Sequence, residues 1–135
     1  MDATKIAIAE ACVNAAESGA KDFPQIVMML ADAGFESYCV DYRRGTATYY
    51  VPDGESVELA VPTVRGPIAK TFDADAIQAA IREAQTKAPG YTYLGFCEKV
   101  RAAGCASYTV SFLGQRAVYS GRSAETHVEY FPASR

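Results

Sequence analysis

The sequence predicts an α+β fold built by tandem duplication, in which a helix-helix-strand-strand-strand unit occurs twice. The first observation is an ungapped internal repeat, since residues 33–40 recur as residues 103–110, 70 positions later. The second is that helical periodicity and then period-two alternation appear in the same order in both copies. The third is a glycine, Gly34 or Gly104, at the same point of each copy.

Length and repeat together predict one domain over residues 1–135, with repeat one over residues 1–65 and repeat two over residues 71–135. Each copy alone is too short for a sizeable core, so we expect the copies to share one. An antiparallel sheet of about six strands, with four helices packed on one face, would bury the apolar side of the helices against the apolar side of the strands. The copies would be related by a pseudo-twofold axis. Whether the sheet is continuous or two sheets face each other stays open.

Two helices are expected at the start of the first copy. Residues 3–18 carry apolar side chains at helical spacing, and Gly19 is a suitable stop. In the second helix Asp22 can cap the first turn and Pro24 fits an early helical position. Gly34 ends this helix, because glycine adopts the left-handed conformation at the lowest cost.

The second copy is expected to form the same two helices. The first begins at a cap from Asp73 or Asp75 and ends at Pro89. The other buries Phe96 and its neighbours and ends at Gly104, as its counterpart ends at Gly34. Residues 62–70 are the linker between the copies.

Alternation after each glycine predicts three strands per copy, joined by tight turns. The side chains expected to face the core are Tyr38, Val40, Tyr42, Ala47, Tyr49, Val51, Val57, Leu59 and Val61, followed by Tyr108, Val110, Phe112, Ala117 and Tyr119. With one inserted residue, Val128-Glu129 matches Val57-Glu58. We therefore expect Glu58 and Glu129 on equivalent polar strand faces, exposed to solvent.

Charge and hydropathy exclude two classes of partner. The chain has 16 acidic and 13 basic residues and a net charge of -3, without the basic stripe of a nucleic-acid-binding protein. Its longest strongly apolar run, residues 26–31, is too short to cross a bilayer. The N-terminal residues do not resemble a secretory signal. We expect no nucleic-acid or membrane partner and a cytoplasmic protein.

The four cysteines, Cys12, Cys39, Cys97 and Cys105, form no CxxC pair, and His127 is the single histidine. We therefore expect reduced, structural cysteines and no metal site. The glycines form neither a GxGxxG nor a P-loop pattern. No cofactor is predicted.

Candidate binding residues gather at the first hairpin of repeat one. Asp41, Arg43 and Arg44 concentrate charge there, and two arginines can clamp a carboxylate or phosphate on a partner. Tyr50 lies on the strand face opposite Tyr49, which favours a place at an interface.

Two further residues complete the candidate set. Glu58 can pair with another carboxylate for acid–base chemistry, although an exposed strand glutamate is also an ordinary solubilising residue. His127 titrates in the range of a general base, but no serine or cysteine motif accompanies it, and we expect an exposed strand position. The predicted binding residues are therefore Asp41, Arg43, Arg44, Tyr50, Glu58 and His127, and no residue is predicted to be catalytic.

Three strings, residues 37–41, 48–50 and 125–132, resemble a family of bacterial proteins typified by YbcV and YdfO. The resemblance covers essentially the whole chain and implies an often prophage-encoded protein, of a family some of whose members carry the label "phage envelope protein". It implies no catalytic residue. Where family members often have a histidine, this chain has Tyr130.

The absence of catalytic motifs favours a non-enzymatic interaction or accessory module of prophage or mobile-element origin, with an unknown protein partner. One alternative is a small-ligand binding domain or enzyme with a cleft between the repeats. Another is a phage structural component of the envelope type. Edge strands of the sheet could also pair between chains, which makes a homodimer possible.

Overall fold

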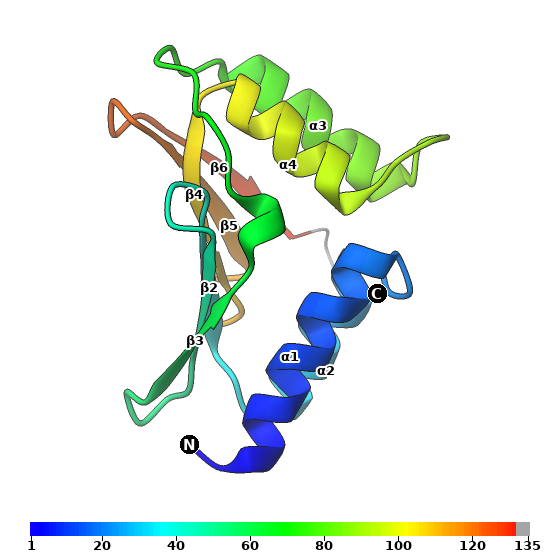
Figure 1. Cartoon of the computed structure of the whole chain (residues 1–135), viewed down its shortest axis with the longest axis vertical. Coiled ribbons are helices and arrows are strands. Elements are labelled where there is room, and N and C mark those ends of the chain that lie inside the picture. The colour runs from blue at the N-terminus through cyan, green and yellow to red at the C-terminus, as the bar shows by residue number, and fades with distance from the viewer. Residues whose placement is uncertain (132–135) are drawn as a thin grey trace.

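Two helices precede three strands in each half of the chain, in the predicted order (Figure 1). The computed structural model describes residues 1–131, so Pro132 of the family-like C-terminal string lies outside the described residues. The fold is α+β, with a six-stranded antiparallel sheet and four α-helices, as predicted. A short 3-10 helix, η1, lies within the expected linker. The elements are α1 (Ala3–Ser18), α2 (Phe23–Asp32), β1 (Ser37–Asp41), β2 (Thr46–Tyr50), β3 (Ser56–Ala60), η1 (Pro62–Val64), α3 (Ala74–Thr86), α4 (Tyr93–Ala102), β4 (Cys105–Ser111), β5 (Arg116–Gly121) and β6 (Thr126–Tyr130).

The helices begin and end through local hydrogen bonds that the sequence encodes. Asp22 forms a capping box with Gln25 at the start of α2, and Asp73, rather than Asp75, caps α3. After α2 and α4 the chain turns at Gly34 and Gly104, with φ of 98° and 96°. Both glycines are left-handed, as predicted.

The six strands form one continuous sheet in the order β3-β2-β1-β4-β5-β6. β1 and β4 join the two halves at its centre, where Cys39 lies opposite Thr109. The β1–β4 pairing therefore shows that the sheet is continuous across both halves, which the sequence leaves open. β3 and β6 are the edges, so a homodimer formed by edge pairing, which stays a prediction, would use them.

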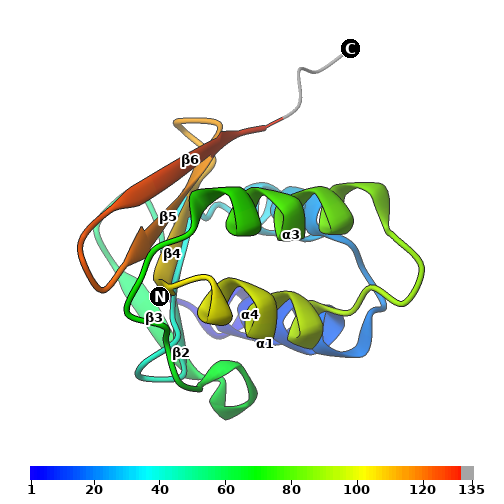
Figure 2. The same ribbon diagram turned by 90° about the horizontal axis from the view of Figure 1, so that it is seen from above.

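All four helices lie on the same side of the sheet, as α1–α2 and α3–α4 pairs (Figures 1 and 2). The core between the layers is rich in tyrosine. Tyr38 stacks on Tyr49 with ring centroids 5.4 Å apart, and Tyr108 stacks on Tyr119 at 5.2 Å. The helices contribute mostly small and branched side chains to this core, together with one phenylalanine: Ala9, Cys12, Leu30, Ile77, Ala80, Ile81, Phe96, Cys97 and Val100.

The expected match of residues 128–129 with residues 57–58 is wrong. Tyr49 of β2 lies opposite Val57, and Tyr119 of β5 lies opposite His127. The pair that closes each turn is Tyr50–Ser56 in one half and Ser120–Thr126 in the other, with five residues between its members in both, so no inserted residue shifts β6. Because a slip of one residue moves a side chain to the other face of a sheet, the expected faces change as well.

Glu58 and Glu129 therefore lie on opposite faces. Glu58 is exposed and contacts Arg44, whereas Glu129 accepts a hydrogen bond from Gln78 of α3 on the helix-covered face. Val57 and Leu59, at the positions of β3 that face the helices, are partly buried against the core. In β6 the equivalent positions, those that pair with Tyr119 and Ala117 of β5, are occupied by His127 and Glu129.

The four cysteines are free thiols, and their reduced state in the cell stays a prediction. Cys12, Cys97 and Cys105 are buried, and burial raises the pKa of the Cys105 thiol to about 12. Cys39 is only partly buried, on the strand face turned away from the helices. It is the thiol that a reagent in solution would reach first.

Candidate functional site

One face of the sheet has no helix across it in the described part of the chain (Figures 1 and 2). We call it the open face. Half of its side chains are serine or threonine, whose short hydroxyls leave the surface low and polar. From β3 to β6 its residues are Ser56, Glu58, Ala60, Thr46, Thr48, Tyr50, Ser37, Cys39, Asp41, Ser107, Thr109, Ser111, Arg116, Val118, Ser120, Thr126, Val128 and Tyr130.

Four predicted site residues meet at the β1–β2 hairpin. The Asp41 carboxylate accepts hydrogen bonds from the backbone amides of Arg43 and Arg44, at 2.9 and 3.0 Å. Asp41 therefore closes the turn, which is a structural role. The Arg44 guanidinium lies 3.5 Å from the Glu58 carboxylate, and both side chains are largely exposed. Such a pair contributes little stability.

The other two predicted residues lie elsewhere. Tyr50 is on the open face, four residues along β2 from Thr46, which separates it from the arginine hairpin by about 13 Å. His127 is on the helix-covered face of β6, with only 17% of its side chain exposed, so the expected exposed position is wrong. The six predicted residues do not form one site.

His127 and Glu129 instead join the sheet edge to the helix layer. His127 Nε2 lies 3.3 Å from Glu129 Oε1, and the same oxygen accepts a hydrogen bond from Gln78 Nε2 at 3.4 Å. Tyr119 packs beside the histidine ring, with centroids 6.5 Å apart. These contacts hold β6 against α3, which is a sufficient structural explanation for the polar pair.

Exposed apolar side chains lie along one end of the open face, which we call the apolar end. Its members are Tyr50, 39% exposed, Leu113, 84% exposed in the β4–β5 turn, and Tyr130, 60% exposed. Tyr50 and Tyr130 are on the same cross-strand row there, about 19 Å apart, with β1, β4 and β5 between them. The Arg116 guanidinium lies over the Tyr130 ring, 4.7 Å from its centroid. Sequence reasoning found Tyr50 alone, because Leu113 and Tyr130 come from the other half of the sheet.

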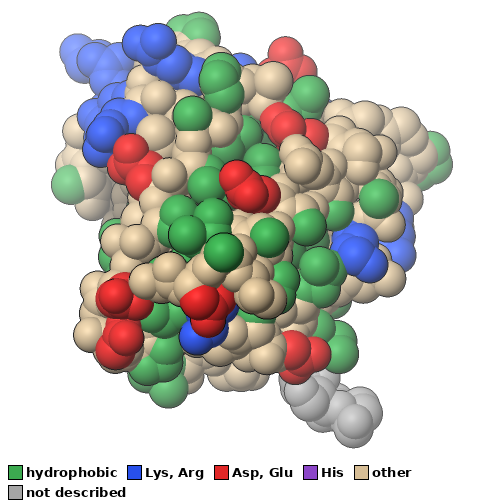
Figure 3. Space-filling view, turned by 60° about the horizontal axis from the view of Figure 1, so that its bottom comes forward, with side chains coloured by type: hydrophobic (Ala, Val, Ile, Leu, Met, Phe, Trp, Pro, Cys, Tyr) green, Lys and Arg blue, Asp and Glu red, His purple; other side chains and the backbone are tan. Residues whose placement is uncertain are grey.

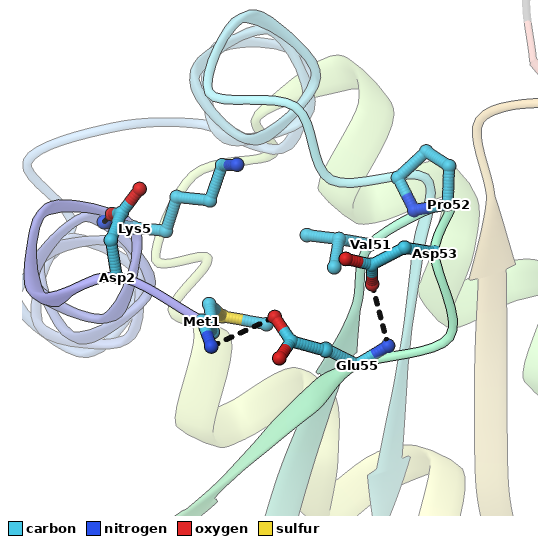
Figure 4. A pocket seen from close by; sticks show the side chains of 7 residues that line it. All are labelled: Met1, Asp2, Lys5, Val51, Pro52, Asp53 and Glu55. Atoms are coloured by element: carbon cyan, nitrogen blue, oxygen red, sulfur yellow. Dashed lines mark hydrogen bonds and ion pairs between the residues drawn. The ribbon is translucent and has the colours of Figure 1, made fainter.

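A hollow of about 390 Å³ lies between the start of α1 and the β2–β3 turn (Figure 4). Its polar groups mostly bind one another. The Met1 amino group lies 2.8 Å from the Glu55 carboxylate, and the Glu55 amide donates a hydrogen bond to Asp53 at 2.8 Å. This hollow has mixed charge, because the Met1 amino group and Lys5 line it together with Asp2, Asp53 and Glu55.

A second hollow, of about 330 Å³, is positively charged. It lies where the β1–β2 turn, the segment after η1 and the β5–β6 turn meet, and we call it the arginine hollow. Arg43, Arg65 and Arg122 line it together with Gly66, Pro67 and Ile68. Sequence reasoning identified Arg43 but missed the other two arginines, since 22 and 79 positions separate them from it.

Neither a metal site nor a membrane span is found within residues 1–131. No three His, Cys, Asp or Glu side chains are grouped there as a metal ion would require. None of the helices described has both the length and the apolar character needed to cross a bilayer.

Comparison with known proteins does not assign the chain to a family. No protein-family model matches the sequence, and no curated protein matches it. The resemblance to the YbcV and YdfO type of protein stays a prediction.

Proposed function

We propose that this chain is a non-enzymatic binding module that contacts a protein partner through its open face. The observation that carries the proposal is the uncovered sheet face itself, with exposed aromatic side chains and an arginine at one end. Tyrosine and arginine are enriched among the residues that dominate binding energy at protein interfaces. The serine and threonine hydroxyls beside them suit a polar rim.

The apolar end is the proposed centre of this interface. Tyr50 and Tyr130 lie on one row across the sheet, together with Ser37, Ser111 and Arg116. The Arg116 guanidinium holds the Tyr130 ring from one side, which reduces the freedom that the ring would lose on binding. A partner that covers this row would bury aromatic surface that water now contacts.

The double substitution Tyr50→Ala and Tyr130→Ala should weaken partner binding at least about tenfold. The partner would first be identified by quantitative capture from the source cell on the wild-type protein, then purified and titrated calorimetrically. Met28→Ala is the matched control, because Met28 is 64% exposed on the helix layer. Equal affinity of the double variant and the wild type, or no protein enriched over the double variant, would refute the proposal.

Cys39 provides an independent measure of the same contact. It lies at the centre of the open face, at the β1–β4 pairing. A bound partner should slow its alkylation, followed by mass spectrometry, whereas a partner bound to the helix layer would leave the rate unchanged. The variant Cys39→Ser identifies which alkylation product comes from Cys39, because the other three thiols are buried.

We further propose that the chain arose by tandem duplication and that its halves are related by a pseudo-twofold axis. The strand pairs support this, since Tyr38–Tyr49 in one half corresponds to Tyr108–Tyr119 in the other, with the same offset of 70 positions as the repeat. An experimental structure should superpose Cα atoms 37–60 on 107–130 by a rotation of about 180°. A rotation far from this value would contradict the proposal.

The resemblance to the YbcV and YdfO type of protein supports a prophage or mobile-element origin as part of the same proposal.

One observation favours a second candidate function, small-ligand binding, because the arginine hollow takes residues from both halves and from the segment between them. The envelope-type structural role would require self-assembly, which light scattering would detect. A cytoplasmic location stays a prediction.

A further inference from the structure

We propose that the arginine hollow is a binding site for the phosphate group of a small molecule. The inference does not depend on the open-face interaction, because a different set of residues carries it. Arg43 comes from the β1–β2 turn, Arg65 from the segment between η1 and α3, and Arg122 from the β5–β6 turn. Figure 3 shows lysine and arginine side chains gathered at one end of the molecule, at the upper left of that view.

The positive charge of the hollow is not neutralised by the protein. Within residues 1–131, no carboxylate lies within 4.0 Å of the guanidinium of Arg43, Arg65 or Arg122. Arg44, the fourth arginine of this region, pairs with Glu58 instead. Three like charges around one hollow in a chain of net charge -3 repel one another, and a bound anion would relieve that repulsion.

Backbone carbonyls hold two of the three side chains in place. Arg65 Nε donates a hydrogen bond to the Arg43 carbonyl at 2.9 Å, and Arg122 Nη1 donates one to the Ile68 carbonyl at 3.2 Å. A guanidinium has five N–H donors, so each keeps donors for a ligand after this bond. Positioning before binding reduces the entropy that a ligand must overcome.

A further guanidinium lies behind the wall of the hollow. Arg101, in the last turn of α4, donates from Nη1 to the Val64 carbonyl at 2.6 Å, and its buried Nε has no partner within the described chain. A Cβ on Gly66 would lie 2.7 Å from Arg101 Cζ. A side chain at position 66 would therefore displace the Arg101 guanidinium from this place. Arg101 therefore adds positive potential from the protein side.

The chemistry of the hollow favours phosphate over other anions. Guanidinium groups bind phosphate oxygens in paired hydrogen bonds, and a dianion with three free oxygens can engage several of them at once. A volume of about 330 Å³ is roughly ten times the share of one water in the liquid, so it holds a phosphate with a small attached group. The arginines surround one hollow rather than forming a stripe, which disfavours a nucleic-acid backbone.

The test is a calorimetric titration at constant ionic strength with inorganic phosphate, glycerol 3-phosphate, malonate and a short single-stranded oligonucleotide. We expect saturable binding of a phosphate probe with a Kd below about 10 mM, and at least about tenfold weaker binding of malonate. Tighter binding of glycerol 3-phosphate than of inorganic phosphate would identify a phosphate monoester as the ligand. Equal binding of the two would identify free phosphate.

The double variant Arg43→Gln and Arg122→Gln should lose at least about tenfold in affinity. Both side chains are exposed, so circular dichroism should show an unchanged fold. Lys21→Gln with Arg82→Gln removes the same charge elsewhere on the surface and should leave binding unchanged. Equal losses in the two double variants would show diffuse attraction only and overturn the proposal. So would the absence of saturable phosphate binding, equal binding of malonate, or tighter binding of the oligonucleotide.

Discussion

Replacing Gly104 with alanine should lower the free energy of unfolding by at least about 3 kcal/mol, the largest effect expected of a single methyl group in this chain. Gly104 has φ of 96°, and an added Cβ would lie 2.3 Å from the Thr71 carbonyl oxygen and 2.9 Å from Phe72 Cα. These are backbone atoms, held beside the glycine by a 2.8 Å hydrogen bond from Asp73 N to the Ala103 carbonyl. The methyl group can be accommodated only if the start of α3 moves.

Gly34 provides a matched control within the same chain. Its φ of 98° is nearly the same, but its Cβ would meet only the Lys5 side chain, at 3.4 Å. Gly34→Ala should therefore cost only the left-handed strain of about 1 to 2 kcal/mol. Urea unfolding of both variants would measure the difference. Equal losses would show that backbone conformation alone, and not the close approach of residues 71–72, requires glycine at position 104.

The protein should unfold cooperatively between about pH 10.5 and 12. Five tyrosines of the core are at most 7% exposed, and burial raises the pKa of each: Tyr38, Tyr42, Tyr49, Tyr108 and Tyr119. Burial also raises the pKa of Tyr91 to about 12.

The stability decreases with rising pH because the folded state holds these tyrosine protons more tightly than the unfolded state does. A buried tyrosine with a raised pKa stays neutral in the folded protein at a pH where the unfolded chain ionises. Stability is therefore fully present below the unfolded pKa of about 10 and is lost as pH rises towards the folded pKa. Each such tyrosine lowers the free energy of unfolding by up to about 1.4 kcal/mol for every pH unit above its unfolded pKa. Five together lower it by up to about 7 kcal/mol per pH unit, which is comparable to the whole stability of a small domain.

Tyrosinate absorbance and far-ultraviolet circular dichroism would follow this transition together. Most of the absorbance should appear as the dichroism is lost, and Tyr49→Phe should raise the pH of the midpoint by removing one titrating group. Tyr130→Phe, at a position that is 60% exposed, is the control and should leave the midpoint unchanged. Gradual ionisation of most tyrosines in a chain that keeps its dichroism would contradict the prediction.

Much of the fold could be read from sequence because its signals are local. Apolar spacing predicted the four helices, and alternation predicted the strands, since each depends on residues a few positions apart. Asp22 and Gly19 fix helix ends through atoms of neighbouring residues. The misplacement of Glu129 shows the limit of such reading. Nothing nearby in the sequence distinguishes its register from one shifted by a residue, and only pairing with β5 decides which face it occupies.

The candidate sites were less predictable because they assemble distant segments. Asp41, Arg43 and Arg44 were found together, since one turn contains them. The arginine hollow needs Arg65 and Arg122 as well, and the packing of the segment after η1 brings them to the β1–β2 turn. Likewise the apolar end combines Tyr50 with Tyr130 from opposite halves of one sheet.

By itself, the sequence determined the fold class, the element order and the two left-handed glycines, because these depend on interactions within a few residues. Tertiary structure alone decided that β1 pairs with β4 in one continuous sheet. It also decided that Gly104, unlike Gly34, is pressed against another backbone, and that three arginines surround one hollow. The physical reason is that each of these contacts joins segments far apart along the chain, whose approach depends on how the whole core packs.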